Sequence, residues 1–279
     1  MSQQQADRIG VDYLSMVGAS LPDFIRTAAA AGARNISLFN TLPANFNPWN
    51  ASLLSACEDA AVRREVISCA RDEGVSIALM EGFAVVPESS VEQHRRGFEV
   101  LAELGVTRVN SVSFDPSWER TIDEMAALAT MGAEYDVTVL IEPCVLFPFG
   151  SLDHVLQLID IVAMPSLKLM IDALHIVRSG DLAALDRIDP VLIGYLQLSD
   201  GLLHSAGSDA YMYEAAHQRL VPGKGELPLV DIVRRVGPEI IVSGEVPMAA
   251  EREAGVSDLD RLKAIVDGIS RTLDLADAA

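Results

Sequence analysis

The sequence has little positive charge, few cysteines and no long apolar run. Only 21 of its 279 residues are Lys or Arg, against 40 Asp or Glu, which gives a formal net charge of -19. Nucleic-acid binding depends on clustered basic side chains that release counterions from phosphates, so this charge argues against a nucleic-acid partner. The charge also disfavours an anionic membrane surface, and no segment reaches the roughly 18 consecutive apolar residues that span a bilayer.

Cysteine is scarce. Cys57, Cys69 and Cys144 form no CxxC pair, and an odd number does not make a disulfide framework, so we expect reduced and mostly buried thiols. The N-terminal segment MSQQQADRIG lacks the basic flank and apolar stretch of a secretory signal and predicts a short tail leading into a strand. These absences together indicate a soluble cytoplasmic protein.

What the chain does contain is a repeating pattern. A short β-branched run, a loop and an apolar stripe at helical spacing recur eight times, which predicts strands that alternate with helices. The predicted strands are 9–15, 33–40, 75–86, 106–113, 137–142, 166–172, 193–199 and 240–245. The predicted helices are 21–32, 60–73, a third capped by Ser90 and running to Gly105, 118–135, 152–163, 181–188, 228–236 and 258–273. Residues 200–227 are predicted to be a long loop.

This alternation requires parallel strands with right-handed crossovers. Near-continuous apolar runs such as VTVLI and EIIVSG suit strands that are covered on both faces. Eight such units in this length predict an α/β fold, a (β/α)8 TIM barrel that forms one domain over residues 1–279. A doubly wound sheet is the alternative, but no early GxGxxG or GxxxxGK[ST] motif opens a helix.

Polar side chains stand where the predicted strands end. They are Glu81, Glu142, Asp172, Gln197 and Glu245. In a (β/α)8 barrel these ends meet at one rim, where active sites form. Carboxylates gathered there repel one another, and a divalent cation relieves the repulsion, so we expect a metal on Glu142, Asp172, Gln197 and Glu245. Taken singly, each acid is explained equally well by capping a helix or pairing with an arginine.

Several segments resemble the sugar phosphate isomerase/epimerase superfamily. These xylose-isomerase-like barrels include tagatose and psicose epimerases, inosose dehydratases and 3-dehydroshikimate dehydratases. The segments are IEP at 141–143, IDALHIVRSGD at 171–181, GYLQLSD at 194–200, RLVPGKGELPL at 219–229 and SGEVP at 243–247. The resemblance implies that Glu142 and Glu245 bind the metal and exchange protons with substrate, and that Asp172 is a ligand. It also implies that His175 and Arg219 contact the substrate, where we expect Glu81 as well.

Strand seven departs from the epimerase and isomerase pattern, because Gln197 stands where those members place a histidine ligand. An all-oxygen ligand set favours Mn2+ or Mg2+, with Co2+ and Zn2+ as alternatives. Some 3-dehydroshikimate dehydratases look similar here, which keeps a dehydratase open. The superfamily's apurinic-site endonucleases need many histidines and a basic surface, whereas this chain has 5 His and its acidic charge.

The expected chemistry begins with proton removal next to a carbonyl. A metal chelated by the carbonyl and a neighbouring hydroxyl stabilises the enediolate, while Glu142 and Glu245 exchange the proton and His175 polarises a substrate oxygen. The leading hypothesis is an isomerase or epimerase of a small polyhydroxylated ketone or aldehyde. The alternatives are a dehydratase or other lyase of a cyclic hydroxyketone, and a non-catalytic barrel that binds a carbohydrate or a partner subunit.

The predicted loop 200–227 carries further polar side chains. Arg219 or Lys224 could meet an anionic group of the substrate, since loops at this barrel position often hold phosphate. Ordinary loop packing is the expectation for His204, Tyr211, Tyr213 and His217. Apolar outer helices such as 153–164 leave a homo-oligomer open.

Overall fold

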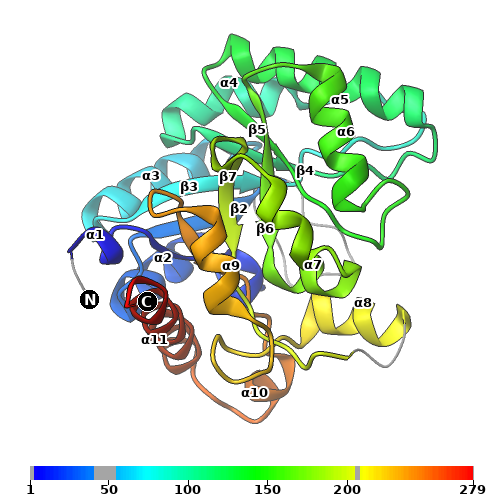
Figure 1. Ribbon diagram of the computed structural model, residues 1–279. Helices are drawn as coiled ribbons and strands as arrows, with labels where there is room; N and C mark the ends of the chain where they lie inside the picture. The colour runs from blue at the N-terminus through cyan, green and yellow to red at the C-terminus, as the bar shows by residue number, and fades with distance from the viewer. Residues whose placement is uncertain (1–2, 41–54, 205–207, 279) are drawn as a thin grey trace.

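A computed structural model describes residues 3–40, 55–204 and 208–278. In these residues eight parallel strands close into a barrel, in which each strand pairs with its neighbours in sequence and β1 pairs with β8 (Figure 1). The predicted barrel is therefore confirmed. The strands are β1 (Ile9–Val11), β2 (Asn35–Phe39), β3 (Ser76–Glu81), β4 (Arg108–Ser111), β5 (Thr138–Ile141), β6 (Leu167–Asp172), β7 (Ile193–Gln197) and β8 (Val242–Gly244).

Helices connect the strands and surround the barrel (Figure 1). The α-helices are α1 (Gln3–Ala6), α2 (Leu21–Ala31), α3 (Ala60–Glu73), α4 (Arg95–Leu104), α5 (Trp118–Glu134), α6 (Leu152–Val162), α7 (Ala173–Ser179), α8 (Ser208–His217), α9 (Leu229–Val236), α10 (Ala249–Glu253) and α11 (Asp258–Asp277). The 3-10 helices are η1 (Tyr13–Met16), η3 (Val91–His94), η4 (Leu182–Arg187) and η5 (Pro190–Leu192). In the described part of the chain, no helix combines the length and apolarity needed to cross a membrane.

Local sequence signals set many of the helix ends. The Ser20 hydroxyl accepts a hydrogen bond from the Asp23 amide (3.2 Å) at the start of α2, and Gly32 ends that helix with a φ of 96°. Glycine adopts this left-handed conformation without steric cost, so it is the usual residue there. Ser90 caps η3, which leads into α4.

Three expectations about local structure were wrong. The sixth helix was expected at 181–188, but α7 begins directly after β6, and the expected segment holds η4 instead. Asp172 caps α7 by accepting hydrogen bonds from the amides of Leu174 (2.7 Å) and His175 (3.2 Å). An acid before a short apolar stretch that ends in Gly180 was a usable signal for this helix. The expected loop 200–227 contains α8, and the expected N-terminal tail contains α1.

Two apolar cores hold the barrel together. The larger core lies between the strands and the surrounding helices, and α11 contributes to it by packing on α2, α9 and β1. A smaller cluster includes Ala78, Leu140, Met170 and Tyr195, which come from four different strands and fill the barrel interior. The three cysteines are free and buried, as expected. Because side chains fill the barrel interior, an active site is expected at the carboxyl ends of the strands.

Candidate active site at the carboxyl end of the barrel

A cavity of about 450 Å³ lies at the carboxyl ends of the strands, within the size range of small-molecule sites. We call its polar base the floor. The floor consists of Glu81, Asn110, Glu142, His175, Arg219 and Glu245. These residues come from strands β3 and β4, from the positions that follow β5 and β8, from α7 and from the segment after α8. The predicted substrate-contacting and proton-transferring residues therefore face one space.

Two of the four predicted metal ligands, Glu142 and Asp172, lie close to His175, which was expected to contact the substrate. Glu142, Asp172 and His175 each offer a ligand atom, and these atoms lie within 4.8 Å of one another, so the group could hold a metal ion. The Gln197 amide nitrogen donates to Glu81 Oε2 (3.3 Å) and Glu245 Oε1 (3.2 Å). Gln197 Oε1 is buried and has no hydrogen-bond partner in the described structure. A buried oxygen without a partner is costly, and a cation beside it would satisfy it.

Arg219 links two of the predicted ligands. Its Nη1 lies 2.6 Å from Asp172 Oδ2 and its Nη2 lies 2.8 Å from Glu245 Oε2. The guanidinium is buried and donates a further hydrogen bond from Nε to the Ala215 carbonyl (2.9 Å). Arg219 is thus bound to carboxylates, and Lys224 does not line the cavity.

The floor crowds acidic groups together and perturbs their protonation. Burial and the charge of Asp172 raise the pKa of Glu142 to about 8. Burial also holds the pKa values of Glu81 and Glu245 well above their ordinary range. For Asp172 burial acts in the same direction, but the adjacent Arg219 guanidinium and hydrogen bonds outweigh it, so the pKa is lowered. A divalent cation would displace the protons and neutralise the carboxylates, so the donor set fits such an ion.

His175 lies beside the acids and is held by a tyrosine that the sequence did not single out. Its Nε2 lies 3.6 Å from Glu142 Oε1 and 3.9 Å from Asp172 Oδ2. Burial lowers the pKa of the imidazole to about 4, so the ring is neutral at ordinary pH. Its Nδ1 is hydrogen-bonded to the hydroxyl of Tyr211 on α8. The expectation that Tyr211 only packs in a loop was wrong, and no local spacing signals this contact between two helices.

Two further acids at strand ends have other surroundings. Asp12, directly after β1, is fully buried, and its Oδ1 accepts from Ser243 Oγ (2.7 Å) and the Tyr195 hydroxyl (3.2 Å). It does not line the cavity, although its position after a strand matches the pattern used for the other acids. Asp200 accepts hydrogen bonds from the amides of Gly223 (2.9 Å) and Leu227 (3.0 Å). Asp200 therefore holds the turn in the segment 219–229.

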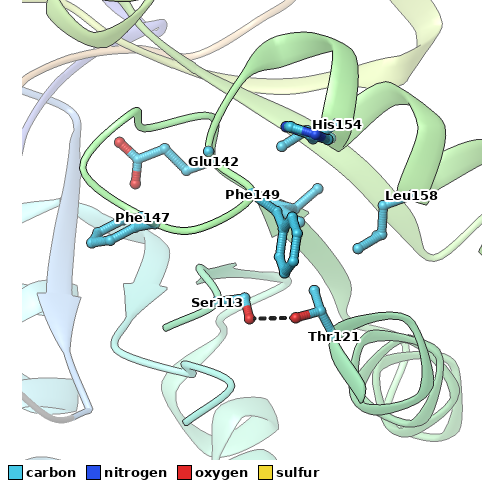
Figure 2. A pocket seen from close by; sticks show the side chains of 10 residues that line it. Ser113, Thr121, Glu142, Phe147, Phe149, His154 and Leu158 are labelled. Carbon is cyan, nitrogen blue, oxygen red and sulfur yellow. Dashed lines mark hydrogen bonds between the residues drawn. The ribbon is translucent and has the colours of Figure 1, made fainter. Parts of the chain in front are cut away.

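The segment after β5 lines both this cavity and a second, smaller one. Figure 2 shows Phe147 next to Glu142, while Phe149 lies toward His154 and Leu158. This second cavity has a volume of about 10 Å³. Ser113 and Thr121 line it, and their hydroxyl groups are hydrogen-bonded to each other (2.8 Å). It has room for about one water molecule, so the larger cavity is the candidate substrate site.

Solved structures share this architecture. A 3-DHS dehydratase named AsbF from Bacillus anthracis has a TM-score of 0.68 at 18% identity, with 94% of this chain and 98% of that chain covered. A D-psicose 3-epimerase from Clostridium cellulolyticum H10, solved with D-tagatose, has a TM-score of 0.68 at 15% identity, with 97% and 98% covered. Identities this low show a shared fold.

A longer protein also contains this architecture. A xylose isomerase-like TIM barrel/4-hydroxyphenylpyruvate dioxygenase fusion protein has a TM-score of 0.74 at 18% identity. The comparison covers 95% of this chain, which spans 42% of the fusion protein's length. No curated protein matches the sequence significantly. The sequence model of the xylose isomerase-like TIM barrel family matches residues 25–275, so the chain belongs to that family.

Proposed function

We propose that this protein is a divalent-metal-dependent isomerase or epimerase of a small hydroxylated ketone or aldehyde. The observation that carries the proposal is the floor, where Glu142 and Glu245 face one substrate-sized cavity beside Asp172 and the unpaired Gln197 oxygen. Two glutamates that face one cavity from different strands can act as general base and general acid. The solved structures that share this fold include a D-psicose 3-epimerase and a 3-DHS dehydratase, which agrees with chemistry at a carbonyl compound.

Four residues would hold the metal: Glu142, Asp172, Gln197 and Glu245. Their oxygen atoms favour Mn2+ or Mg2+, and the nearby imidazole of His175 keeps Co2+ or Zn2+ as alternatives. When bound, the ion supplies positive charge that stabilises negative charge developing on the substrate's carbonyl oxygen. Arg219 keeps Asp172 and Glu245 oriented through its two short ion pairs.

Proton transfer is assigned to the two glutamates. Glu142 and Glu245 follow strands that are three positions apart around the barrel, so they approach the cavity from different sides. One carboxylate removes the proton from the carbon beside the carbonyl, and the other returns a proton to it or to the adjacent carbon. His175 is neutral, and with Nδ1 engaged by Tyr211 its Nε2 is available to a substrate oxygen. Glu81 completes the floor as a further contact to substrate.

A dehydratase or other lyase is the second candidate. The observation that favours it is Gln197, which replaces the histidine ligand expected of epimerase members. In that reaction the first proton removal is the same, but a β-hydroxyl then leaves the substrate.

One experiment separates these chemistries. The protein is stripped of metal, reloaded with Mn2+ or Mg2+ and incubated in deuterated water with ketoses, inososes and 3-dehydroshikimate. Deuterium incorporation without new ultraviolet absorbance is the expected result, whereas enone or aromatic absorbance would support the dehydratase. Bound metal without exchange or dehydration on any compound would contradict both and favour a non-catalytic barrel.

A further inference from the structure

Apolar side chains form a second part of the cavity lining, besides the floor. We call six side chains the wall: Leu14, Phe39, Phe83, Val112, Phe114 and Phe147. The rings of Phe114 and Phe147 meet edge to face, with centroids 4.7 Å apart. They belong to the loops after β4 and β5, and the Phe114 backbone is fixed by a hydrogen bond from its amide to the Val85 carbonyl (2.9 Å). The wall is therefore an apolar part of the cavity lining, in which Phe114 and Phe147 are held by ring packing and a backbone hydrogen bond.

The charges around the cavity disfavour an anionic substrate. Among the described residues that line it, Arg219 carries the only permanent positive charge. Both of its terminal nitrogens are already paired, one with Asp172 and the other with Glu245. Besides the metal ion of the proposed function, which the carbonyl end would approach, the described lining offers no free cation, so a phosphate or carboxylate elsewhere on the substrate would lie near acidic groups without a partner. This argues for an uncharged substrate.

The wall also disfavours hydroxyl groups along the whole substrate. Hydrogen-bonding side chains are concentrated on the floor, so a hydroxyl placed against the wall would lose water without gaining a partner. An apolar group in the same place gains free energy because its surface leaves water, and aromatic rings gain further from edge-to-face contacts. Among the described lining residues, the polar partners for a substrate therefore lie on the floor.

We infer that the cavity binds an uncharged hydroxyketone or hydroxyaldehyde whose other end is an apolar, ring-containing body. The inference deepens the proposed function and rests on it for the placement of the polar end on the floor. The apolar body lies against Phe114 and Phe147. Phosphorylated sugars and sugars with hydroxyls on every carbon then bind more weakly than such a compound.

Binding of matched probes tests the inference. The Mn2+-loaded protein is titrated by calorimetry with 2-hydroxyacetophenone, 1,3-dihydroxyacetone, D-fructose and D-fructose 6-phosphate. Because the phenyl ring fits the wall, 2-hydroxyacetophenone should bind at least about tenfold more tightly than either fructose compound. Equal or tighter binding of a fructose compound would overturn the inference, as would undetectable binding of 2-hydroxyacetophenone.

Two phenylalanines in one loop provide a matched pair of variants. Phe147→Ala should weaken binding of 2-hydroxyacetophenone about tenfold and leave binding of 1,3-dihydroxyacetone unchanged. Phe149→Ala is the control, because its ring packs on Trp118 (4.9 Å between centroids) and His154 (5.7 Å) and does not line the cavity. Equal weakening by both substitutions would reflect a general loop effect and contradict the inference.

Deuterium exchange separates the two proposals. The methylene group of 2-hydroxyacetophenone lies beside its carbonyl, so the proposed chemistry should exchange its protons with solvent. Tight binding of this compound without exchange on any probe would contradict the proposed function and leave the inference standing. Exchange on D-fructose without preferential binding of the phenyl compound would overturn the inference and leave the proposed function standing.

Discussion

The two halves of the barrel contribute differently to the cavity. Strands β1 to β4 and the segments after them provide most of the wall, including Leu14, Phe39, Phe83 and Phe114. The half that begins with β5 provides most of the ionisable floor, and Glu81 is the acid that the first half adds. The segments that carry the family resemblance all lie between 141 and 247. The second half therefore carries the motifs that resemble the family, whereas the first half contributes most of the apolar wall that a substrate would contact.

The largest expected difference between the two halves is the effect on kcat of replacing their glutamates. Glu142→Gln and Glu245→Gln should each lower kcat by about 10³, because general acid–base groups contribute on that scale. Glu81→Gln should change kcat by less than about tenfold, because burial keeps the pKa of Glu81 high and the protonated acid resembles an amide. Deuterium incorporation with the metal-loaded variants measures the effect. An equally severe Glu81→Gln would remove the distinction between the halves.

Replacing Arg219 tests whether its positive charge offsets the repulsion between the buried carboxyl groups of the second half. Arg219→Met leaves two buried carboxyl groups without their partner, so the free energy of unfolding of the metal-free protein should fall by about 3–5 kcal/mol. Mn2+ should restore more stability to this variant than it adds to the unmodified protein, as measured by urea unfolding. Arg178→Met is the matched control, because Arg178 pairs with Glu214 (2.6 Å) and does not line the cavity. Equal losses without recovery by Mn2+ would contradict this view of the floor.

The affinity for Mn2+ should depend on pH because a predicted ligand in the second half, Glu142, must lose a proton to bind the ion. The carboxyl group of Glu142, which faces Asp172, His175 and Arg219, has its pKa raised to about 8, so it is protonated below that pH. Metal binding must release this proton and the one that burial keeps on Glu245, so affinity should rise by at least about tenfold per pH unit, and the contribution of Glu142 should level off above about pH 8. Calorimetry in several buffers measures both affinity and proton release. A flat profile would contradict the assignment of Glu142 as a ligand.

Tyr211 should produce the smallest effect. Tyr211→Phe removes the hydroxyl at His175 Nδ1 and should lower kcat about tenfold, as expected for a group that orients another side chain. The nitrogen-15 chemical shifts of the His175 ring should change with it, because they report the tautomer. Tyr213→Phe on the same helix is the control, since Tyr213 is exposed. Unchanged ring shifts in Tyr211→Phe would show that Tyr211 does not position His175.

The barrel and the floor could be predicted because their signals are local. Apolar runs bounded by serine and glycine caps located the strands, and an acid after a run located Glu142 and Glu245. The wall could not be predicted, because no sequence signal distinguishes a phenylalanine that packs in the core from one that lines a cavity. The contacts of Tyr211 with His175 and of Arg219 with two acids join distant segments, which no spacing reveals.

Tyr195 helps to close the barrel interior, so the floor is reached from one end of the barrel. In the described part of the chain its ring and the residues packed around it fill the barrel interior below the floor, and its hydroxyl bonds to the sealed Asp12 carboxylate. The route to the floor therefore runs past the wall from the carboxyl end. In the part of the chain that the structure describes, the barrel interior thus supports the floor from the side of the strands' amino ends and offers no second entrance to it.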